Sequence, residues 1–258
     1  MINKILLSIK MQFRVPISVF FSLIFPIIMI IVIILSYGNF SIGNGRHFID
    51  KYFLISTSIG LLPIAFISFP IWLSESIENE TLKRLKYFEV NISSLIVSNI
   101  ISYCFLAIFS VILNIIIGKV FFSLTLPNTQ YFIAFFFQIF YNIIALLMIG
   151  TFLALLIRKS KVLLPLGMIL LFLTYMIIGV FVQYGELPNV LKEIGNWIPI
   201  KYVTNDFYSI WINERMWDAS FLKLNSLYII VTSVLSLFIS LRNEENNDVE
   251  ETRNASDY

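Results

Sequence analysis

Residues 74 to 88 read SESIENETLKRLKYF and carry six charged side chains in fifteen positions. Glu80 lies three residues before Lys83 and four before Arg84, and on a helix these spacings put the side chains next to one another. Carboxylates near a membrane can activate water in an intramembrane protease, but that chemistry needs further His or paired acidic groups within the spans. The long apolar runs contain no Asp, Glu, Lys, Arg or His except Lys223 at an edge. The residues therefore disfavour an enzyme.

The same stretch has two other interpretations. A charged turn between two membrane spans commonly does no more than hold the chain at the lipid headgroups. The alternative is a helix on which a cytoplasmic protein docks, where charge gives register and apolar side chains give affinity. The acids Glu75, Glu78 and Glu80 favour docking, because an anionic membrane surface repels carboxylates. Ser76 or Asn79 is suited to cap the start of such a helix.

Other residue types that could do chemistry are scarce. One histidine, His47, and one cysteine, Cys104, lie far apart in the sequence, which is too few ligands for a zinc site and excludes an intramolecular disulfide. The only Gly-Lys pair, Gly118-Lys119, is followed by Val120 and does not match the phosphate-binding loop of an ATPase. We therefore expect no catalytic, cofactor-binding or metal-binding residue in this chain. A net charge of +2 gives no reason to expect a nucleic-acid partner.

Composition indicates the elements that must hold these residues. Of the 258 residues, 58% are hydrophobic and only 13% are charged, against roughly a quarter charged in soluble domains. Since a membrane-crossing helix needs about 20 apolar residues, the uncharged runs mark the spans. We predict an all-α polytopic membrane protein with a membrane domain at 1–241. Its six predicted spans are 16–36, 52–74, 92–117, 131–157, 162–183 and 222–241.

The distribution of Lys and Arg predicts the orientation of the spans. The side that carries both termini collects 11 of these residues, including Arg158, Lys159 and Lys161 in one short loop, whereas the other side has 7. Both termini are therefore predicted to be cytoplasmic. Residues 2–14 show apolar positions at helical spacing with basic residues between them, which predicts a helix in the cytoplasmic membrane interface. Residues 242–258 are acidic, lack apolar periodicity and are predicted to form a disordered cytoplasmic tail.

The stretch 187–214, on the outer side, predicts two short amphipathic helices that are broken near Pro199. Its apolar and aromatic residues recur at helical spacing on both sides of that proline. Either the helices dip into the outer leaflet or they lie on it as an aromatic belt, and the sequence leaves both open. The residues that define the segment are Trp197, Pro199, Tyr202, Phe207 and Trp211.

Three polar side chains, Asn114, Gln138 and Asn142, fall within the predicted spans. They either hydrogen-bond between helices or touch a transported molecule. Because ion pathways usually place ionisable groups inside the bundle, an ion-coupled transporter or channel is disfavoured. A pathway without fixed charge suits an amphipathic cargo better than a small ion.

The order of these parts resembles the membrane permease of type-2 ABC exporters, which move drugs, lantibiotics, polysaccharides or lipids outward. The family's cytoplasmic turn carries an acid, a Thr-Leu pair and a basic-Leu pair, here Glu80, Thr81, Leu82, Arg84 and Leu85. The later stretch NWIPIKYVTNDFYSIW resembles the family's segment before the last span. In one position the chain departs from the pattern: Glu80 stands where a glycine often precedes Thr-Leu.

The resemblance implies that 75–88 is a coupling helix on which a separate ABC ATPase docks, with two ATPase copies binding ATP and Mg²⁺. A second permease chain, identical or related, would complete the pathway within the lipids of a bacterial plasma membrane. The docking residues implied are Glu75, Glu78, Glu80, Thr81, Leu82, Arg84 and Leu85. A membrane anchor or assembly protein without a transport role is the remaining alternative.

Overall fold

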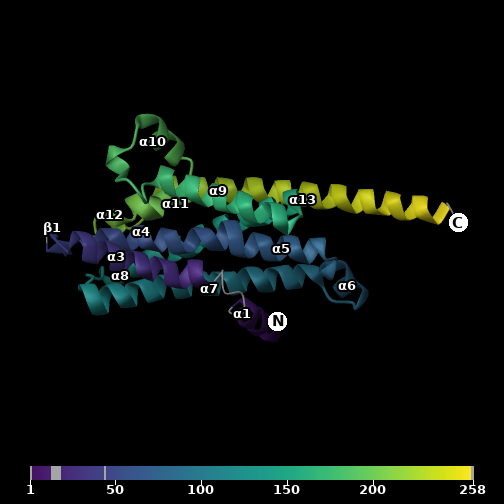
Figure 1. Ribbon diagram of the computed structural model, residues 1–258, viewed down its shortest axis with the longest axis horizontal. Coiled ribbons are helices and arrows are strands. Elements are labelled where there is room, and N and C mark those ends of the chain that lie inside the picture. The colour runs from purple at the N-terminus through teal and green to yellow at the C-terminus, as the bar shows by residue number, and fades with distance from the viewer. Residues whose placement is uncertain (1, 13–18, 44, 257–258) are drawn as a thin grey trace.

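The computed structural model describes residues 2–12, 19–43 and 45–256 and consists almost entirely of helices (Figure 1). The predicted all-α fold is confirmed, with one two-stranded antiparallel sheet, β1 (Ser41–Gly43) and β2 (Arg46–His47), in the described part. The helices of the bundle are α1 (Ile2–Gln12), η1 (Phe20–Ile24), α3 (Phe25–Tyr37), α4 (Phe48–Pro63), η2 (Ile64–Ser68), α5 (Phe69–Glu78), α6 (Thr81–Tyr87), α7 (Ile92–Phe122), α8 (Thr129–Ile157), α9 (Ser160–Ile178) and α13 (Ala219–Ser256).

Six helical stretches of the described chain are long and apolar enough to cross a membrane, as predicted. They are Phe20–Tyr37, Phe48–Glu78, Ile92–Phe122, Thr129–Ile157, Ser160–Ile178 and Ala219–Ile239. The fifth differs from its predicted end at residue 183, because Gly179 takes a left-handed conformation (φ 87°) and turns the chain after Ile178. Predicted span residues 16–18 lie outside the described residues.

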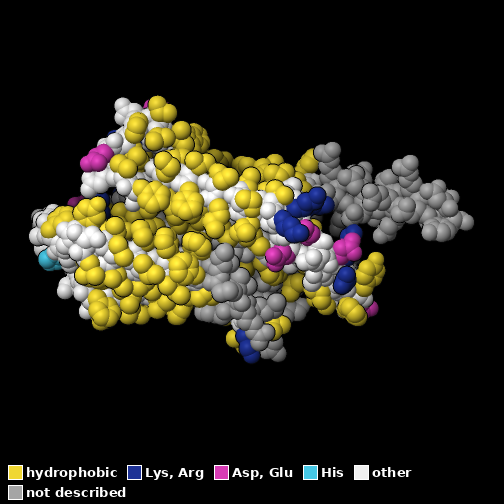
Figure 2. Space-filling model, in the orientation of Figure 1, with side chains coloured by type: hydrophobic (Ala, Val, Ile, Leu, Met, Phe, Trp, Pro, Cys, Tyr) yellow, Lys and Arg dark blue, Asp and Glu magenta, His cyan; other side chains and the backbone are white. Residues whose placement is uncertain are grey.

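The bundle has two chemically different ends. Two spans, Phe48–Glu78 and Ile92–Phe122, have 31 residues each and are therefore about 46 Å long, whereas the hydrocarbon layer is about 30 Å thick. Because both spans are long, α6, which connects them, lies farther along the bundle axis than the start of α3 (Figure 1). Figure 2 shows a broad hydrophobic surface along the bundle, with Lys, Arg, Asp and Glu gathered near α6. We call this the α6 end and the opposite one the β1 end.

The helix formed by α4, η2 and α5 is the most buried of the spans. Pro63 lacks the N–H that would bond the Ile59 carbonyl four residues back, and the π-helical turn η2 follows directly. Two glycines let neighbouring helices approach this turn. A Cβ on Gly150 of α8 would lie 2.6 Å from the Ala65 carbonyl oxygen, and one on Gly167 of α9 would overlap that of Phe66.

At the β1 end a buried carboxylate joins two loops. Asp50, in the first turn of α4, accepts hydrogen bonds from the backbone N–H of His47 and of Thr125, both at 2.8 Å. Arg46 lies 4.0 Å from the same carboxylate and donates to the Thr125 carbonyl at 3.2 Å. The start of α4 is thereby capped and tied to the loop that follows α7.

The terminal helices differ from expectation in detail. α1 packs on α7, with Ser8 buried and Leu6 and Leu7 exposed. Predicted helix residues 13 and 14 lie outside the described residues, and an interfacial position for α1 stays a prediction. The predicted disordered tail is instead helical, because α13 continues to Ser256. A helix that is already formed extends without a further nucleation cost.

Glycine 167 supplies a test of this packing. We expect Gly167→Ala to destabilise the protein by about 1–3 kcal/mol, because the new methyl group would overlap the Phe66 carbonyl and force α9 away from η2. Thermal unfolding of the detergent-solubilised protein would measure the effect. Gly185→Ala is the matched control, since a Cβ there meets nothing within 4 Å. Equal transition temperatures for the two variants would contradict the close approach of α9.

Candidate functional site

The predicted coupling helix at 75–88 is divided in two. Residues 75 to 78 continue the second span as the end of α5, and only Thr81–Tyr87 form the separate helix α6. The break lies at Asn79, the C-cap of α5, and at Glu80, whose φ of 54° is left-handed. A side chain at such a position is unfavourable and glycine is favoured. The glycine that often stands here in type-2 ABC permeases therefore fits the turn that Glu80 adopts.

The predicted charge pairs on α6 are present only in part. Lys83 Nζ lies 3.5 Å from Glu80 Oε1, with both side chains more than half exposed. Between Glu80 and Arg84, both in the described part of the chain, the contact is a backbone one: the Arg84 N–H donates to the Glu80 carbonyl at 3.0 Å. Exposed pairs contribute about 0–1 kcal/mol. They help to orient a partner and do little for stability.

Glu78 makes a contact that the sequence did not indicate. Its Oε2 accepts hydrogen bonds from the backbone N–H of Ser160 at 2.9 Å and from the Ser160 hydroxyl at 2.8 Å. It therefore caps the start of α9, whose own N-cap residue, Lys159, offers no side-chain acceptor. The predicted capping role of Ser76 is wrong, because its hydroxyl donates to the Trp72 carbonyl at 2.8 Å.

The far end of α6 exposes two aromatic side chains. Tyr87 is 83% exposed and Phe88 is 79% exposed, whereas Leu82 and Leu85 are partly buried against the turn. Aromatic residues of this kind are typical anchors of a protein interface. The sequence analysis left both out of the docking set because it weighted charge. Their signal is two consecutive aromatic residues directly after a charged helix.

The second predicted site lies at the β1 end and comprises η3 (Tyr184–Glu186), α10 (Asn189–Gly195), α11 (Pro199–Lys201), η4 (Tyr202–Asp206) and α12 (Tyr208–Trp211). Trp197 is 65% exposed, but the residues after Pro199 enter the bundle. Phe207 and Trp211 are fully buried. The Trp211 ring lies 4.4 Å from that of Phe53 on α4. We call residues 199–211 the inserted segment.

The inserted segment packs on α4 and α8 and meets the last residue of α9, which is a shorter helix than its neighbour α8. α9 has 19 residues and is about 28 Å long, whereas its neighbour α8 has 29 and is about 43 Å long. Two polar contacts hold the segment in place. The Thr204 hydroxyl lies 2.9 Å from that of Ser58 on α4, and Asn205 Nδ2 donates to the Ile178 carbonyl at 2.9 Å.

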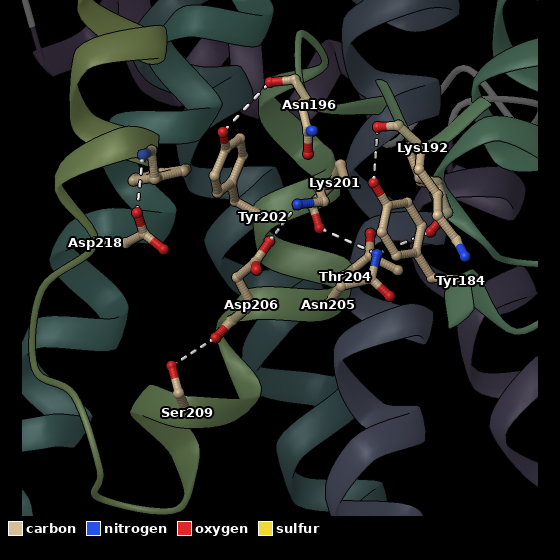
Figure 3. Close-up of polar contacts among 12 residues, drawn as sticks. Tyr184, Lys192, Asn196, Lys201, Tyr202, Thr204, Asn205, Asp206, Ser209 and Asp218 are labelled. Carbon is tan, nitrogen blue, oxygen red and sulfur yellow. Dashed lines mark hydrogen bonds and ion pairs between the residues drawn. The ribbon is translucent and has the colours of Figure 1, made fainter. Parts of the chain in front are cut away.

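A buried ion pair lies within the inserted segment. Lys201 is 7% exposed, and its Nζ is 2.9 Å from Asp206 Oδ2 (Figure 3). The ammonium also faces the rings of Tyr202 and Tyr184, 4.6 Å and 5.1 Å from their centroids. Burial raises the pKa of Tyr202 above its ordinary value, and the charges of Asp206 and Asp218 add to this. The phenol therefore stays neutral.

An open cleft of about 440 Å³ adjoins this pair. Arg215, at its rim, is ion-paired with Asp218. Polar and charged residues line it, and it opens at the surface. Its lining residues are Asn205, Asp206, Tyr208, Ser209, Glu214 and Arg215.

Of the three predicted polar residues within the spans, Asn114 joins three helices. Its Nδ2 donates to the Ser110 carbonyl on its own helix, α7, at 3.1 Å. Its Oδ1 lies 3.2 Å from the Ser56 hydroxyl of α4, which is 2.8 Å from the Pro26 carbonyl of α3. The side chain is buried, so these contacts replace those that water would otherwise make.

Of the other two, Gln138 contacts the residues just before α13, and Asn142 contacts α13 itself. Gln138 Nε2 donates to the Met216 carbonyl at 3.0 Å, and its Oε1 accepts from the Asp218 N–H at 3.2 Å. Asn142 Nδ2 donates to Asn225 Oδ1 of α13 at 3.0 Å. All three amides thus make contacts between elements, and contact with a transported molecule stays a prediction.

The comparison with known families decides the identity. The family model described as ABC-2 type transporter matches residues 6–212, a range that includes both α6 and the inserted segment. The chain belongs to this family. The resemblance drawn from the sequence is confirmed, and the chain is a membrane-spanning transporter permease. No curated protein and no solved structure gives a significant match. Within its described residues, the permease has no group of three His, Cys, Asp or Glu that could hold a metal.

The left-handed turn at Glu80 supplies a test at the α6 end. We expect Glu80→Gly to keep or raise the stability of the permease, because it removes about 1–2 kcal/mol of backbone strain. Glu75→Gly is the matched control and should lower stability by about 1 kcal/mol, because Glu75 lies inside α5. Thermal unfolding in detergent compares the two. If Glu80→Gly destabilises the permease as much as the control does, the left-handed conformation at Glu80 would be contradicted.

The buried ion pair predicts an asymmetry between its two partners. Asp206→Asn should destabilise the permease by about 1–3 kcal/mol, because it leaves the buried ammonium of Lys201 without its counter-charge. Lys201→Met should cost less, because Met fills the same space and the Asp206 side chain, 33% exposed, can reach water. Thermal unfolding at one pH measures both. A larger loss for Lys201→Met would show that the pair is not organised around a buried cation.

Proposed function

We propose that this permease is half of the translocation pathway of an ATP-binding-cassette exporter. In this proposal two permease chains, identical or related, stand side by side in the membrane, and each receives one copy of a separate ATPase at its α6 end. ATP and Mg²⁺ are bound by the ATPase, because the chain has no phosphate-binding loop of the G-x-x-x-x-G-K-[ST] type. The family assignment supports a permease role.

The exposed tip of α6 is the observation that carries the docking proposal. Tyr87 and Phe88 are largely uncovered at a place that the two longest spans carry past membrane thickness. Two large aromatic side chains in water are unfavourable unless a partner covers them. Beside them, the exposed charges of Glu80 and Lys83 would set the orientation of that partner. Of the predicted docking residues, Glu78 is already engaged by α9, so we assign it to positioning.

The charge distribution supports a cytoplasmic α6 end. The 11 Lys and Arg residues on the side of the termini exceed the 7 on the other side. With an even number of spans, both termini then lie in the cytoplasm. The inserted segment and its polar cleft would face outward, on the release side of the pathway. The apolar and aromatic character of the spans favours an amphipathic cargo, such as a peptide, drug or lipid.

Copurification tests the docking proposal. The permease would be expressed with the candidate ATPase encoded beside it and purified in detergent by a tag on the permease. We expect capture of the ATPase, and a loss of about tenfold or more in Tyr87→Ala/Phe88→Ala, because interface anchors contribute 2 kcal/mol or more. Tyr37→Ala is the matched control, since Tyr37 is 71% exposed at the β1 end.

The outcomes separate the alternatives. Capture that survives the aromatic variant but is lost in Glu78→Lys/Glu80→Lys would move the interface to the acidic side of the turn. Capture that survives both would place docking elsewhere on the permease. No capture by the unaltered chain would contradict the ATPase-driven mechanism and favour an anchor or assembly role.

A further inference from the structure

Helix α9 is tied at its α6 end to the segment that precedes α6. Glu78, the last residue of α5, accepts two hydrogen bonds from Ser160, the first residue of α9. A carboxylate at this place also interacts favourably with the positive end of the helix dipole. Asn79 and Glu80 follow directly and lead into α6. A displacement of α6 therefore acts on the start of α9 through this carboxylate, beside the packing of α9 on α5.

The opposite end of α9 is tied to the inserted segment. Asn205 Nδ2 donates to the carbonyl of Ile178, the last residue of α9, at 2.9 Å (Figure 3 shows Asn205 beside Lys201 and Asp206). Carbonyls in the last turn of a helix have no partner within the helix, so this side chain supplies one. Asn205 adjoins Asp206 in the chain and lines the polar cleft with it. Motion of the end of α9 therefore acts on the wall of the cleft.

Between its ends, α9 is fixed to the central helix. Gly167 lets the backbone of α9 meet the Phe66 carbonyl of η2. The Tyr175 hydroxyl donates at 2.7 Å to the carbonyl of Ile59, which Pro63 deprives of its usual donor. These contacts hold the middle of α9 against the central helix and limit its bending between its two ends.

We propose that α9 transmits movement of α6 to the inserted segment, with Glu78 and Asn205 as the positioning residues at its two ends. This inference rests on the proposed function, since ATPase closure on α6 supplies the movement. Displacement of α9 shifts Asn205, and with it the Lys201–Asp206 pair, so that the cleft at the β1 end changes its access to water. The predicted role of Glu78 changes accordingly, from binding the ATPase to passing on its motion.

The experiment follows the cleft with a thiol probe. Ser209, which lines the cleft, is replaced by Cys in a Cys104→Ala background, and the permease–ATPase complex is placed in lipid nanodiscs. A polar, membrane-impermeant maleimide labels the thiol with and without ATP and vanadate. The ratio of the two labelling rates measures the ATP-driven change at the β1 end. Capture and hydrolysis of ATP by the same complex are measured in parallel.

In the parent complex we expect the ratio to differ from one. In Asn205→Ala the ATP-driven change should become about fivefold smaller, because one hydrogen bond of ordinary strength is lost. ATPase capture and hydrolysis should stay unchanged, because Asn205 is remote from α6. Asn205→Gln, which keeps an amide donor, should restore part of the change. At the other end, Glu78→Ala should have the same effect and Glu78→Gln a smaller one, because the amide oxygen of Gln can still accept from Ser160.

The results distinguish this inference from the function on which it rests. If the unaltered chain captures no ATPase, the proposed function fails and no transmission step remains. If capture and hydrolysis are intact but the parent shows no ATP-driven change at Ser209→Cys, the inference is overturned and the permease role stands. The same holds if Asn205→Ala and Glu78→Ala both keep the full change. If Asn205→Ala abolishes the ATP-driven change in labelling and Asn205→Gln restores none of it, Asn205 has a structural role. That result would also overturn the inference.

Discussion

The bundle depends on the way its central helix satisfies its backbone inside a membrane. In hydrocarbon no water replaces a lost backbone hydrogen bond, yet Pro63 removes a donor in the middle of the most buried span. The Tyr175 hydroxyl of α9 supplies the Ile59 carbonyl with a substitute donor. Gly150 and Gly167 allow α8 and α9 to pack directly on the turn that follows. The irregular turn is therefore stable only with these two helices against it, and this fixes their depth and rotation.

The two ends of the permease differ in how far their charged residues are buried. At the β1 end, the carboxylate of Asp50 and the ammonium of Lys201 are buried and paired, the latter with the partly exposed Asp206. Buried charges that keep their partners hold loops in one arrangement, although they add little net stability. At the α6 end, charge and aromatic surface are left uncovered at Glu80 and Tyr87. This contrast supports the proposed docking of a partner at the α6 end.

The spans could be predicted because an uncharged run of about 20 residues has few other uses. The αL turn at Glu80 was visible only through its departure from the family pattern, and the bond from Glu78 to Ser160 could not be found because it joins positions 82 apart. A basic N-cap, Lys159, was the one local sign that α9 needs an acid from elsewhere. Composition also suggested a disordered tail, whereas α13 continues to Ser256. Local patterns thus identify elements, and contacts between distant segments decide how they are joined.

Helix length and burial are linked in this bundle. Among the described apolar stretches, those of 29 to 31 residues are the most buried, and α9, with 19 residues, is among the least buried. The outer part of the bundle therefore includes a helix of about 28 Å, close to the thickness of an ordinary hydrocarbon layer. A thicker bilayer would have to thin beside this short helix. Longer acyl chains in the host membrane would therefore raise the free-energy cost of deforming the lipid beside α9.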